Sequence, residues 1–241
     1  QYVLRVKEIA SCKLLADEIP NIEPNIVWGD DNKTIYYIEK DPVTLLSKRV
    51  KAHVLGTPVA QDRLVYEEPD DTFYVHIGRS RDDKFILITS DATVSTEVRY
   101  APADGSAAFQ VIAPRQRDFE YQADHLGGRW VMRTNWGAKN FKLMQLADGV
   151  ATGDRAKWTA LVPHSDETYI EDYELFDGFI AIEERSGGLL RVRTLAPDGK
   201  SEFIASDESA YAMSLSVNAE PNTTLVRYSY DSLTTPHTQY E

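Results

Sequence analysis

Apolar and polar residues alternate along much of this chain, in short runs that recur from one end to the other. Alternation at period two is typical of a β-strand with one buried face. Each such run is followed by a tight turn and a second, strongly β-forming run. Helical periodicity is nearly absent, so the pattern predicts an all-β chain. The paired runs occupy residues 25–40, 72–90, 119–135, 171–186 and 212–230.

The paired runs form a repeat with a period of about fifty residues, which is the range of propeller repeats. Each of the first four pairs is followed by two further strand patterns, and four strands per repeat is the composition of a propeller blade. The repeat therefore predicts a β-propeller. The second strands align on Ile35, Ile86, Val131, Ile180 and Val226.

The strand count predicts four complete four-stranded blades plus partial blades at both ends, so we expect a propeller fragment excised from a longer protein. The cut ends would expose unpaired backbone groups, which folded sheets normally avoid. Two outcomes are open: closure of the partial blades into one ring, or edge-to-edge self-association of the fragment, which we favour. The expected boundaries are 1–20 (end of a blade), 21–68, 69–115, 116–165 and 166–207 (blades), and 208–241 (incomplete blade).

Composition narrows the possible environments and partners. The 241 residues are 42% apolar and carry a formal net charge of −12, and the basic residues are outnumbered and interspersed with acids. Binding to nucleic acid needs clustered Lys and Arg, so we expect no nucleic-acid partner. The longest apolar runs are too short for a membrane span. The single Cys12 excludes an internal disulfide, which suits the cytoplasm, although a removed signal peptide would leave the periplasm open.

Residues 49–71 combine two strand patterns and one loop in a short stretch with a distinctive motif. The motif is H-V-L-G-T at 53–57, followed by Asp62, a Leu-Val-Tyr run and Glu67-Glu68. This stretch resembles the propeller domain of the prolyl oligopeptidase family of serine peptidases. Other passages extend the resemblance over essentially the whole chain, and two of them favour the oligopeptidase B (protease II) branch. Those passages are 133–135 with 139–143, 228–236, and, for the branch, 41–46 and 118–121.

The turns between strands contain the residues that tight hairpins need. Asp30-Asp31-Asn32, Gly127-Gly128, Asp177-Gly178 and Asp198-Gly199 can adopt positive φ at low cost. They predict antiparallel meanders. One departure from the family pattern is Cys12, which stands in a turn where glycine would suit the backbone better.

The resemblance implies that this chain has a non-catalytic function. In that family the Ser-His-Asp triad lies in an α/β-hydrolase domain that follows the propeller, and the propeller admits short peptides while excluding folded proteins. The implied partners are therefore the C-terminal peptidase domain of the same parent chain and short peptides, cleaved after basic residues, which the acidic charge would attract. The alternative is an independent propeller that binds a protein or a carbohydrate.

No residue of the chain itself is predicted to be catalytic. The nucleophile elbow G-x-S-x-G is absent, and the nearest match, residues 78–82, lacks the second glycine. Substrate-binding residues are left unassigned. No cofactor or metal is expected, because the histidines show no metal-binding spacing and one cysteine cannot build a Cys-rich zinc site. The histidines are His53, His76, His125, His164 and His237, and we expect His53 to be a strand residue with a hydrogen-bonded ring.

Two further sets of charged residues have side chains that could form sites. Paired carboxylates can serve acid–base chemistry in a glycosidase, but adjacent residues on a strand face opposite sides, so we expect charges at the rim. Arginines can hold a peptide carboxylate, but we expect isolated surface salt bridges for most of them. The carboxylate pairs are Glu67-Glu68, Asp70-Asp71 and Glu183-Glu184, and the basic residues are Arg115, Arg117, Arg133, Lys139 and Arg185.

Overall fold

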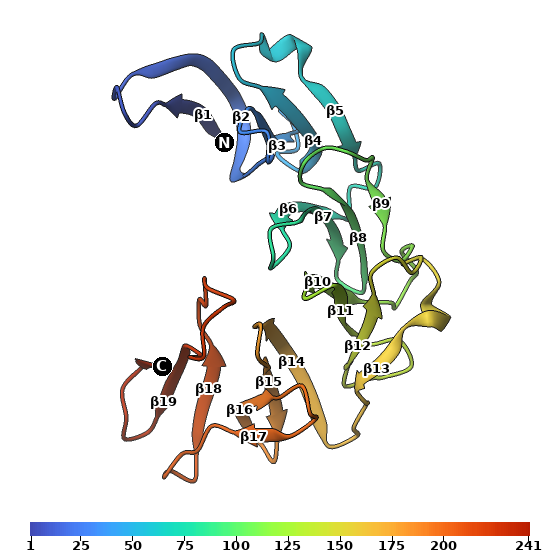
Figure 1. The fold of residues 1–241 in the computed structure, drawn as a ribbon, viewed down its shortest axis with the longest axis vertical. Helices are drawn as coiled ribbons and strands as arrows, with labels where there is room; N and C mark the ends of the chain where they lie inside the picture. The colour runs from blue at the N-terminus through green and yellow to red at the C-terminus, as the bar shows by residue number, and fades with distance from the viewer. The chain divides into compact units, whose positions relative to one another are not determined.

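Almost every regular element of the protein is a β-strand, which confirms the all-β prediction. The computed structural model describes all residues 1–241 and contains twenty strands, together with two short 3-10 helices, η1 (Val59–Gln61) and η2 (Arg155–Lys157). Figure 1 shows the chain and labels most of the strands. The chain divides into two units, residues 1–118 and 119–241, and each is described by itself. Neither helix is long or apolar enough to span a bilayer.

Unit 1 contains one five-stranded and one four-stranded antiparallel sheet. Strand β2 passes through the expected blade boundary at residue 20: its first part pairs with β1 and its last part with β3. The single strand β2 thus joins β1 to β3 within one sheet. The first sheet is β1 (Tyr2–Lys7), β2 (Leu14–Trp28), β3 (Thr34–Lys40), β4 (Ser47–Val54) and β5 (Arg63–Glu67); the second is β6 (Tyr74–Arg79), β7 (Phe85–Ala92), β8 (Ser95–Pro102) and β9 (Gln110–Val111).

The core of unit 1 forms where these two sheets face each other. The alternating apolar residues of β3 and β4 pack with those of β6 and β7, and Ile38, Val50 and Ile86 are at most 1% exposed. Burial of a side chain of this size contributes about 1.5–3 kcal/mol. The period-two pattern therefore stabilises the contact between successive sheets as well as each sheet itself.

Unit 2 contains a four-stranded sheet and a seven-stranded sheet. Their shared core includes Val131 and Leu143 from the first and Ile170 and Ile182 from the second, all at most 2% exposed. The first sheet is β10 (Tyr121–Leu126), β11 (Arg129–Thr134), β12 (Lys142–Ala147) and β13 (Thr159–Val162); the second is β14 (Thr168–Leu175), β15 (Ile180–Ser186), β16 (Leu189–Leu195), β17 (Ser201–Phe203), β18 (Tyr211–Leu215), β19 (Tyr228–Ser232) and β20 (Thr238–Tyr240).

The last three strands form the expected meander, with two differences from the sequence prediction. Strand β18 pairs with β16 in parallel through Leu190 and Ala212, so the meander joins the preceding sheet. Strand β19 begins at Tyr228, beyond the alignment residue Val226. The cause is Asn218, whose Oδ1 accepts a hydrogen bond from Arg227 N at 2.6 Å and whose Nδ2 donates to Ser216 O at 2.7 Å. These bonds replace ladder pairs at this point.

Most of the expected turn conformations are present. Asn32, Gly127 and Gly199 have φ of 54°, 66° and 85°. Gly178 is not among the residues with positive φ, so the expectation for Asp177-Gly178 was wrong. There the hairpin is closed by a hydrogen bond from Phe176 N to Phe179 O at 3.0 Å. Cys12 has a φ of 56°, in the left-handed region where glycine is favoured.

Replacing Cys12 with glycine is expected to stabilise the chain by about 0.5 kcal/mol. Removing Cβ relieves a left-handed strain of about 1 kcal/mol, and part of this gain is lost to the greater freedom of glycine in the unfolded chain. The measurement is the free energy of unfolding in urea. The control is Cys12→Ala, which removes the sulfur and keeps Cβ; equal stabilisation by alanine and glycine would contradict the conformational explanation.

Candidate functional site

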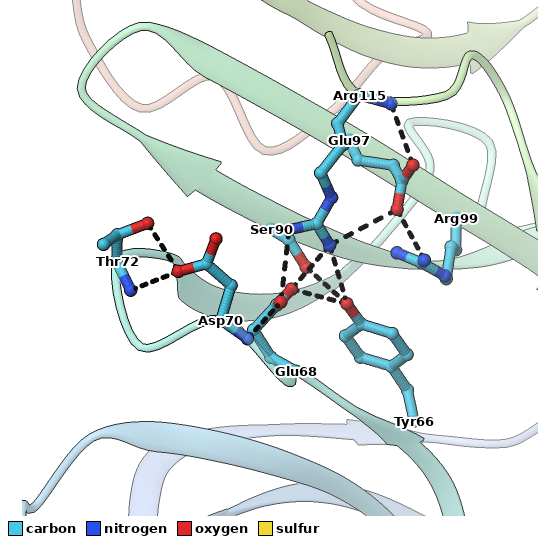
Figure 2. Close-up of polar contacts among 8 residues, drawn as sticks. All are labelled: Tyr66, Glu68, Asp70, Thr72, Ser90, Glu97, Arg99 and Arg115. Atoms are coloured by element: carbon cyan, nitrogen blue, oxygen red, sulfur yellow. Dashed lines mark hydrogen bonds and ion pairs between the residues drawn. The ribbon is translucent and has the colours of Figure 1, made fainter. Parts of the chain in front are cut away.

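A buried ionic network lies in unit 1, where the chain leaves β5 and meets β8 and the segment after β9 (Figure 2). The hydrogen bond from Glu68 N to Lys48 O, 2.9 Å long, continues the pairing of β5 with β4 and fixes the position of Glu68. Alternation along the strand then turns Glu67 outward and Glu68 inward, and Glu68 is 1% exposed. The network consists of Tyr66, Glu68, Ser90, Glu97, Arg99 and Arg115.

Arg115 lies at the centre of this network. Its Nη1 and Nη2 donate to the two carboxylate oxygens of Glu68 at 3.1 and 2.7 Å, which is the bidentate geometry of strong arginine–carboxylate pairs. Nη2 also donates to the Tyr66 hydroxyl at 3.0 Å, and the guanidinium lies 4.0 Å from the centre of the Phe73 ring. Arg115 therefore connects the end of β5 to the segment after β9.

A second ion pair completes the network and balances its charge. Glu97 Oε1 lies 2.5 Å from Arg99 Nη2, and Glu97 Oε2 accepts a hydrogen bond from Arg115 N at 2.9 Å. The Arg99 guanidinium lies 4.1 Å from the centre of the Tyr66 ring. Two carboxylates thus face two guanidinium groups, a balance that offsets the cost of burying charge.

The directions of the pKa shifts favour the ionised forms of Glu68 and Arg115. Burial by itself would raise the pKa of Glu68, but hydrogen bonds from Arg115, Tyr66 and Asp70 N outweigh it and hold that pKa below its usual value. Burial would lower the pKa of Arg115, and the Glu68 carboxylate more than reverses this. Burial and the bond to Glu68 raise the pKa of Tyr66. No member of the Glu68–Arg115 pair is ready to exchange a proton, so the network holds strands together and is unsuited to acid–base catalysis.

His53 is the centre of a second buried cluster in unit 1. Its ring is 0% exposed, with Nδ1 at 2.7 Å from Asp62 Oδ1 and Nε2 at 3.0 Å from Asp17 Oδ1. Tyr37 donates its hydroxyl to Asp62 Oδ2 at 2.8 Å, and Gly56 N donates to Asp17 Oδ1 at 2.6 Å. Gly56 has a φ of 83°, which explains the glycine of the H-V-L-G-T motif.

This cluster confirms the expected hydrogen-bonded ring at His53 and connects three strands. Burial would lower the pKa of His53, but the hydrogen bonds to Asp62 and Asp17 raise it above its usual value. Each ring nitrogen faces a carboxylate oxygen, an arrangement that favours the protonated ring. Because both ring nitrogens are already bonded and the ring is buried, His53 has no position from which to accept a substrate proton.

The other four histidines lie apart from one another and do not form a common site. Three of them each face one aspartate: His76 faces Asp91 at 3.2 Å, His125 faces Asp148 at 2.8 Å and His237 faces Asp231 at 3.7 Å. No group of three or more His, Cys, Asp or Glu side chains has an arrangement that could hold a metal ion.

The expectation of rim charges was wrong for two carboxylates. Glu68 is buried as described, and Glu184 is 3% exposed, with Oε2 at 2.6 Å from Arg193 Nε. Their neighbours behave differently: Glu67 pairs with Arg49 at the surface, and Glu183 accepts a hydrogen bond from Leu215 N at 2.7 Å. Adjacent residues do face opposite sides, but a second sheet covers one of those sides. The exposed pair Asp70-Asp71 lies in the turn before β6.

The expectation of isolated surface salt bridges is confirmed for three of the five basic residues. Arg117, Lys139 and Arg185 each face one acidic residue and are more than half exposed. Arg115 and Arg133 differ. Arg133 is 9% exposed, donates from Nε to Ile170 O at 2.8 Å and lies 3.7 Å from the centre of the Phe141 ring, so it joins β11 to β14.

The nearest match to a nucleophile elbow, residues 78–82, lies at the hairpin turn between β6 and β7. Ser80 is 3% exposed, and its hydroxyl donates to Asp82 Oδ1 at 2.9 Å and accepts from Phe85 N at 3.0 Å. A hydroxyl held in this way closes the turn and is not presented to a substrate.

The sequence interpretation missed Glu208, which organises the end of the chain. Its carboxylate accepts hydrogen bonds from the hydroxyls of Ser232, Thr234 and Thr235 at 2.6, 2.6 and 2.7 Å. These bonds lower the pKa of Glu208 to about 2. The available signal was the run of hydroxyl residues at 232–235, which can surround one acceptor.

Replacing Glu208 with glutamine is expected to remove an acid-sensitive part of the stability. Because the pKa is lowered in the folded chain, the ionised carboxylate stabilises the fold above its ordinary pKa of 4.5, and this contribution is lost as the pH falls towards 2. The free energy of unfolding of the natural chain should therefore fall more steeply with acid than that of Glu208→Gln. The control is Asp207→Asn at the exposed neighbour; equal acid sensitivity in Glu208→Gln and the natural chain would contradict the assignment.

Comparisons with known proteins find similarity over the whole length of the chain. The family model described as "Prolyl oligopeptidase, N-terminal beta-propeller domain" matches residues 1–241. Dipeptidyl aminopeptidase BI of Pseudoxanthomonas mexicana is 54% identical over 100% of this chain and 33% of its own length. Protease 2 of Moraxella lacunata is 27% identical over 100% of this chain and 34% of its own length.

The solved structures give the same result for the fold. Oligopeptidase B from Leishmania major superposes with a TM-score of 0.89 at 25% identity, covering 99% of this chain and 35% of that protein. Oligopeptidase B from Trypanosoma brucei superposes with a TM-score of 0.84 at 27% identity, covering 94% of this chain and 33% of that protein. The chain spans about a third of the length of the curated relatives it matches.

Proposed function

Since this chain belongs to the prolyl oligopeptidase family, as its N-terminal β-propeller domain, we propose that it is the non-catalytic gating and scaffold part of a serine peptidase that cleaves short peptides. The observation that carries the proposal is the match of the propeller model to the whole chain, while relatives named as peptidases are about three times longer. The remaining length of such a relative is large enough for a peptidase domain.

In this proposal the partner of the propeller is a C-terminal α/β-hydrolase domain of the same parent chain. That domain supplies the nucleophile, the base and the oxyanion hole, none of which has a candidate among the residues described above. The propeller supplies a rigid wall that admits short peptides. Arg115, His53 and Arg133 serve this role indirectly, because each connects strands that a loose propeller would allow to move apart.

The names of the similar proteins support two possible modes of peptide cleavage. Cleavage after basic residues is our first proposal, supported by the likeness to proteins named oligopeptidase B and by the net charge of −12, which would raise the local concentration of basic peptides. Removal of dipeptides is the second, supported by 54% identity to a protein named dipeptidyl aminopeptidase. A charge-based attraction implies that added salt lowers the rate for basic peptides.

The test compares the full-length protein with the 241-residue chain. Two fluorogenic substrates are used, an N-blocked dibasic peptide and a dipeptide with a free amino terminus. We expect turnover by the full-length protein that is blocked by a serine-directed inhibitor, and none by the chain alone. Inhibitor-sensitive turnover by the chain alone would overturn the non-catalytic assignment, and the preferred substrate distinguishes the two modes. A parent reading frame without a downstream G-x-S-x-G would instead favour an independent binding propeller.

We also propose that the isolated chain associates with a second copy through its sheet edges. Strands β1 and β20 each end the order of their sheet and leave one side unpaired. Unpaired strand edges template pairing with other chains. Sedimentation over a wide range of concentration tests this, and a monomer at every concentration would exclude it.

A further inference from the structure

A pocket of about 430 Å³ lies in unit 2, between the sheet of β10–β13 and the strands β14–β17. Its volume falls within the range of about 300–1,000 Å³ that is usual for small-molecule sites. One wall is apolar and includes Phe141, Val162 and Pro163. The opposite wall is the face of β15, β16 and β17, and it carries the charged and hydroxyl groups.

The polar wall is built by cross-strand pairing. Glu184 lies opposite Arg191, and Arg193 lies opposite Phe203, so their side chains project from the same face. Alternation places Ser186 on this face as well, two residues after Glu184. The strand register, rather than a flexible loop, therefore determines which groups line the pocket.

One of the two arginines, Arg193, is bonded to neighbouring side chains. Arg193 pairs with the buried Glu184 at 2.6 Å and donates from Nη1 to Ser201 Oγ at 2.8 Å. These two charges neutralise each other. The Arg193–Glu184 pair is therefore neutral, and Arg191 carries the remaining charge of the pocket.

Arg191 has no acidic partner. Its guanidinium lies 3.6 Å from the centre of the Phe203 ring, which fixes its plane, and its Nε is buried without a hydrogen-bond partner. The Ser186 hydroxyl is also buried without a partner. Buried donors without acceptors are rare, and each costs about 1–3 kcal/mol. Two such groups in one pocket, beside a guanidinium with no acidic partner, favour an acceptor that carries negative charge.

We propose that this pocket binds the carboxylate group of a small organic acid or of a peptide C-terminus, with Arg191 as the anchoring cation. A planar carboxylate matches the arginine fork, because Nε and one Nη can donate to its two oxygens. The Ser186 hydroxyl donates to the same group, and the uncharged remainder of the ligand packs against the apolar wall. The site does not depend on the peptidase function proposed above, because it uses only residues of unit 2.

Two of the probes differ only in the group that the pocket would recognise, and two others vary the source of the negative charge. They are N-acetyl-Ala-Phe with a free carboxylate, the same dipeptide as its C-terminal amide, benzoate, and inorganic phosphate. Binding is measured by calorimetry on the 241-residue chain and on the full-length protein. We expect saturable binding of the free carboxylates and at least about tenfold weaker binding of the amide, since the amide removes a charge-assisted pair worth about 1.5–3 kcal/mol. Tighter binding of the peptide than of benzoate identifies a peptide C-terminus as the source, and equal binding identifies organic acids in general.

The variants test the assignment of Arg191. Arg191→Met should weaken binding at least about tenfold, and Arg191→Lys should give an intermediate loss because it keeps the charge and loses the fork. Ser186→Ala should weaken binding by about three- to tenfold. The matched control is Arg185→Met, on the opposite face of β15 and paired with Glu171, which should bind as the natural chain does. Unfolding curves confirm that each variant is folded.

Three results would overturn the proposal. The first is no saturable binding of either carboxylate at about 10 mM, where a specific site would be occupied. The second is equal affinity in Arg191→Met and the natural chain. The third is binding of phosphate without binding of the carboxylates, which would assign the pocket to another anion.

Discussion

Replacing Arg115 with methionine is expected to lower the free energy of unfolding by roughly 3 kcal/mol, near the lower end of the range for a broken buried ion pair. The change leaves the Glu68 carboxylate 1% exposed and without its cation, and Glu97 adds a second negative charge nearby. The lower end applies because the Arg115 side chain is 26% exposed, so water partly screens the pair. Urea denaturation measures the loss.

Two further variants make this result specific. Arg117→Met, two residues away, removes an arginine that is 89% exposed and 3.7 Å from its partner, and should change stability by less than about 0.5 kcal/mol. The double variant Arg115→Met with Glu68→Leu removes both charges and should recover much of the loss. A loss in Arg115→Met no greater than in Arg117→Met would show that the network contributes no stability.

Replacing His53 with glutamine is expected to cost roughly 2–4 kcal/mol near pH 6, because Asp17 and Asp62 then share the cluster without a cation. The loss should depend on pH in a defined direction. The pKa of His53 is raised in the folded chain, so its contribution is complete below its ordinary value of 6.5 and is lost as the pH rises through the folded value. The pKa of Asp17 is lowered, chiefly by the hydrogen bond from Gly56, so its contribution is lost when the pH falls below its ordinary value of 3.8.

The difference in stability between the natural chain and His53→Gln should therefore be largest between these limits and shrink above neutral pH. Unfolding in urea at a series of pH values gives this curve. His237→Gln is the control, because that ring lies at the surface and is 67% exposed. A difference that stays constant from about pH 5 to 9 would mean that folding does not shift the pKa of this ring, contrary to the assignment.

The positions of the strands followed from the sequence with few errors, and the reason is local. A strand needs only alternation at period two and a turn, and both are properties of neighbouring residues. Four of the five aligned residues, Ile35, Ile86, Val131 and Ile180, lie in strands and are at most 4% exposed. The fifth, Val226, missed its strand because the Asn218 side chain occupies the backbone groups beside it, and that contact spans nine residues.

The buried charged sites could not be predicted in the same way, because they depend on contacts between sheets. Alternation placed Glu67 and Glu68 on opposite faces but did not say which face another sheet covers, so both were expected at the rim. The partner that buries Glu68 is Arg115, 47 residues away, which no local pattern connects to it. The same holds for the unpaired Arg191, since the sequence shows an arginine but not the absence of an acidic neighbour.

The sequence by itself therefore determined the strand pattern, the repeat, the family resemblance and the hydrogen-bonded ring of His53, because each rests on local periodicity or on a contiguous motif. Only the tertiary structure decided which charges are buried and with what partners. Burial is a property of the packed sheets: the pleat directs a side chain to one face, and the next sheet determines whether that face meets water, an ion pair or a pocket.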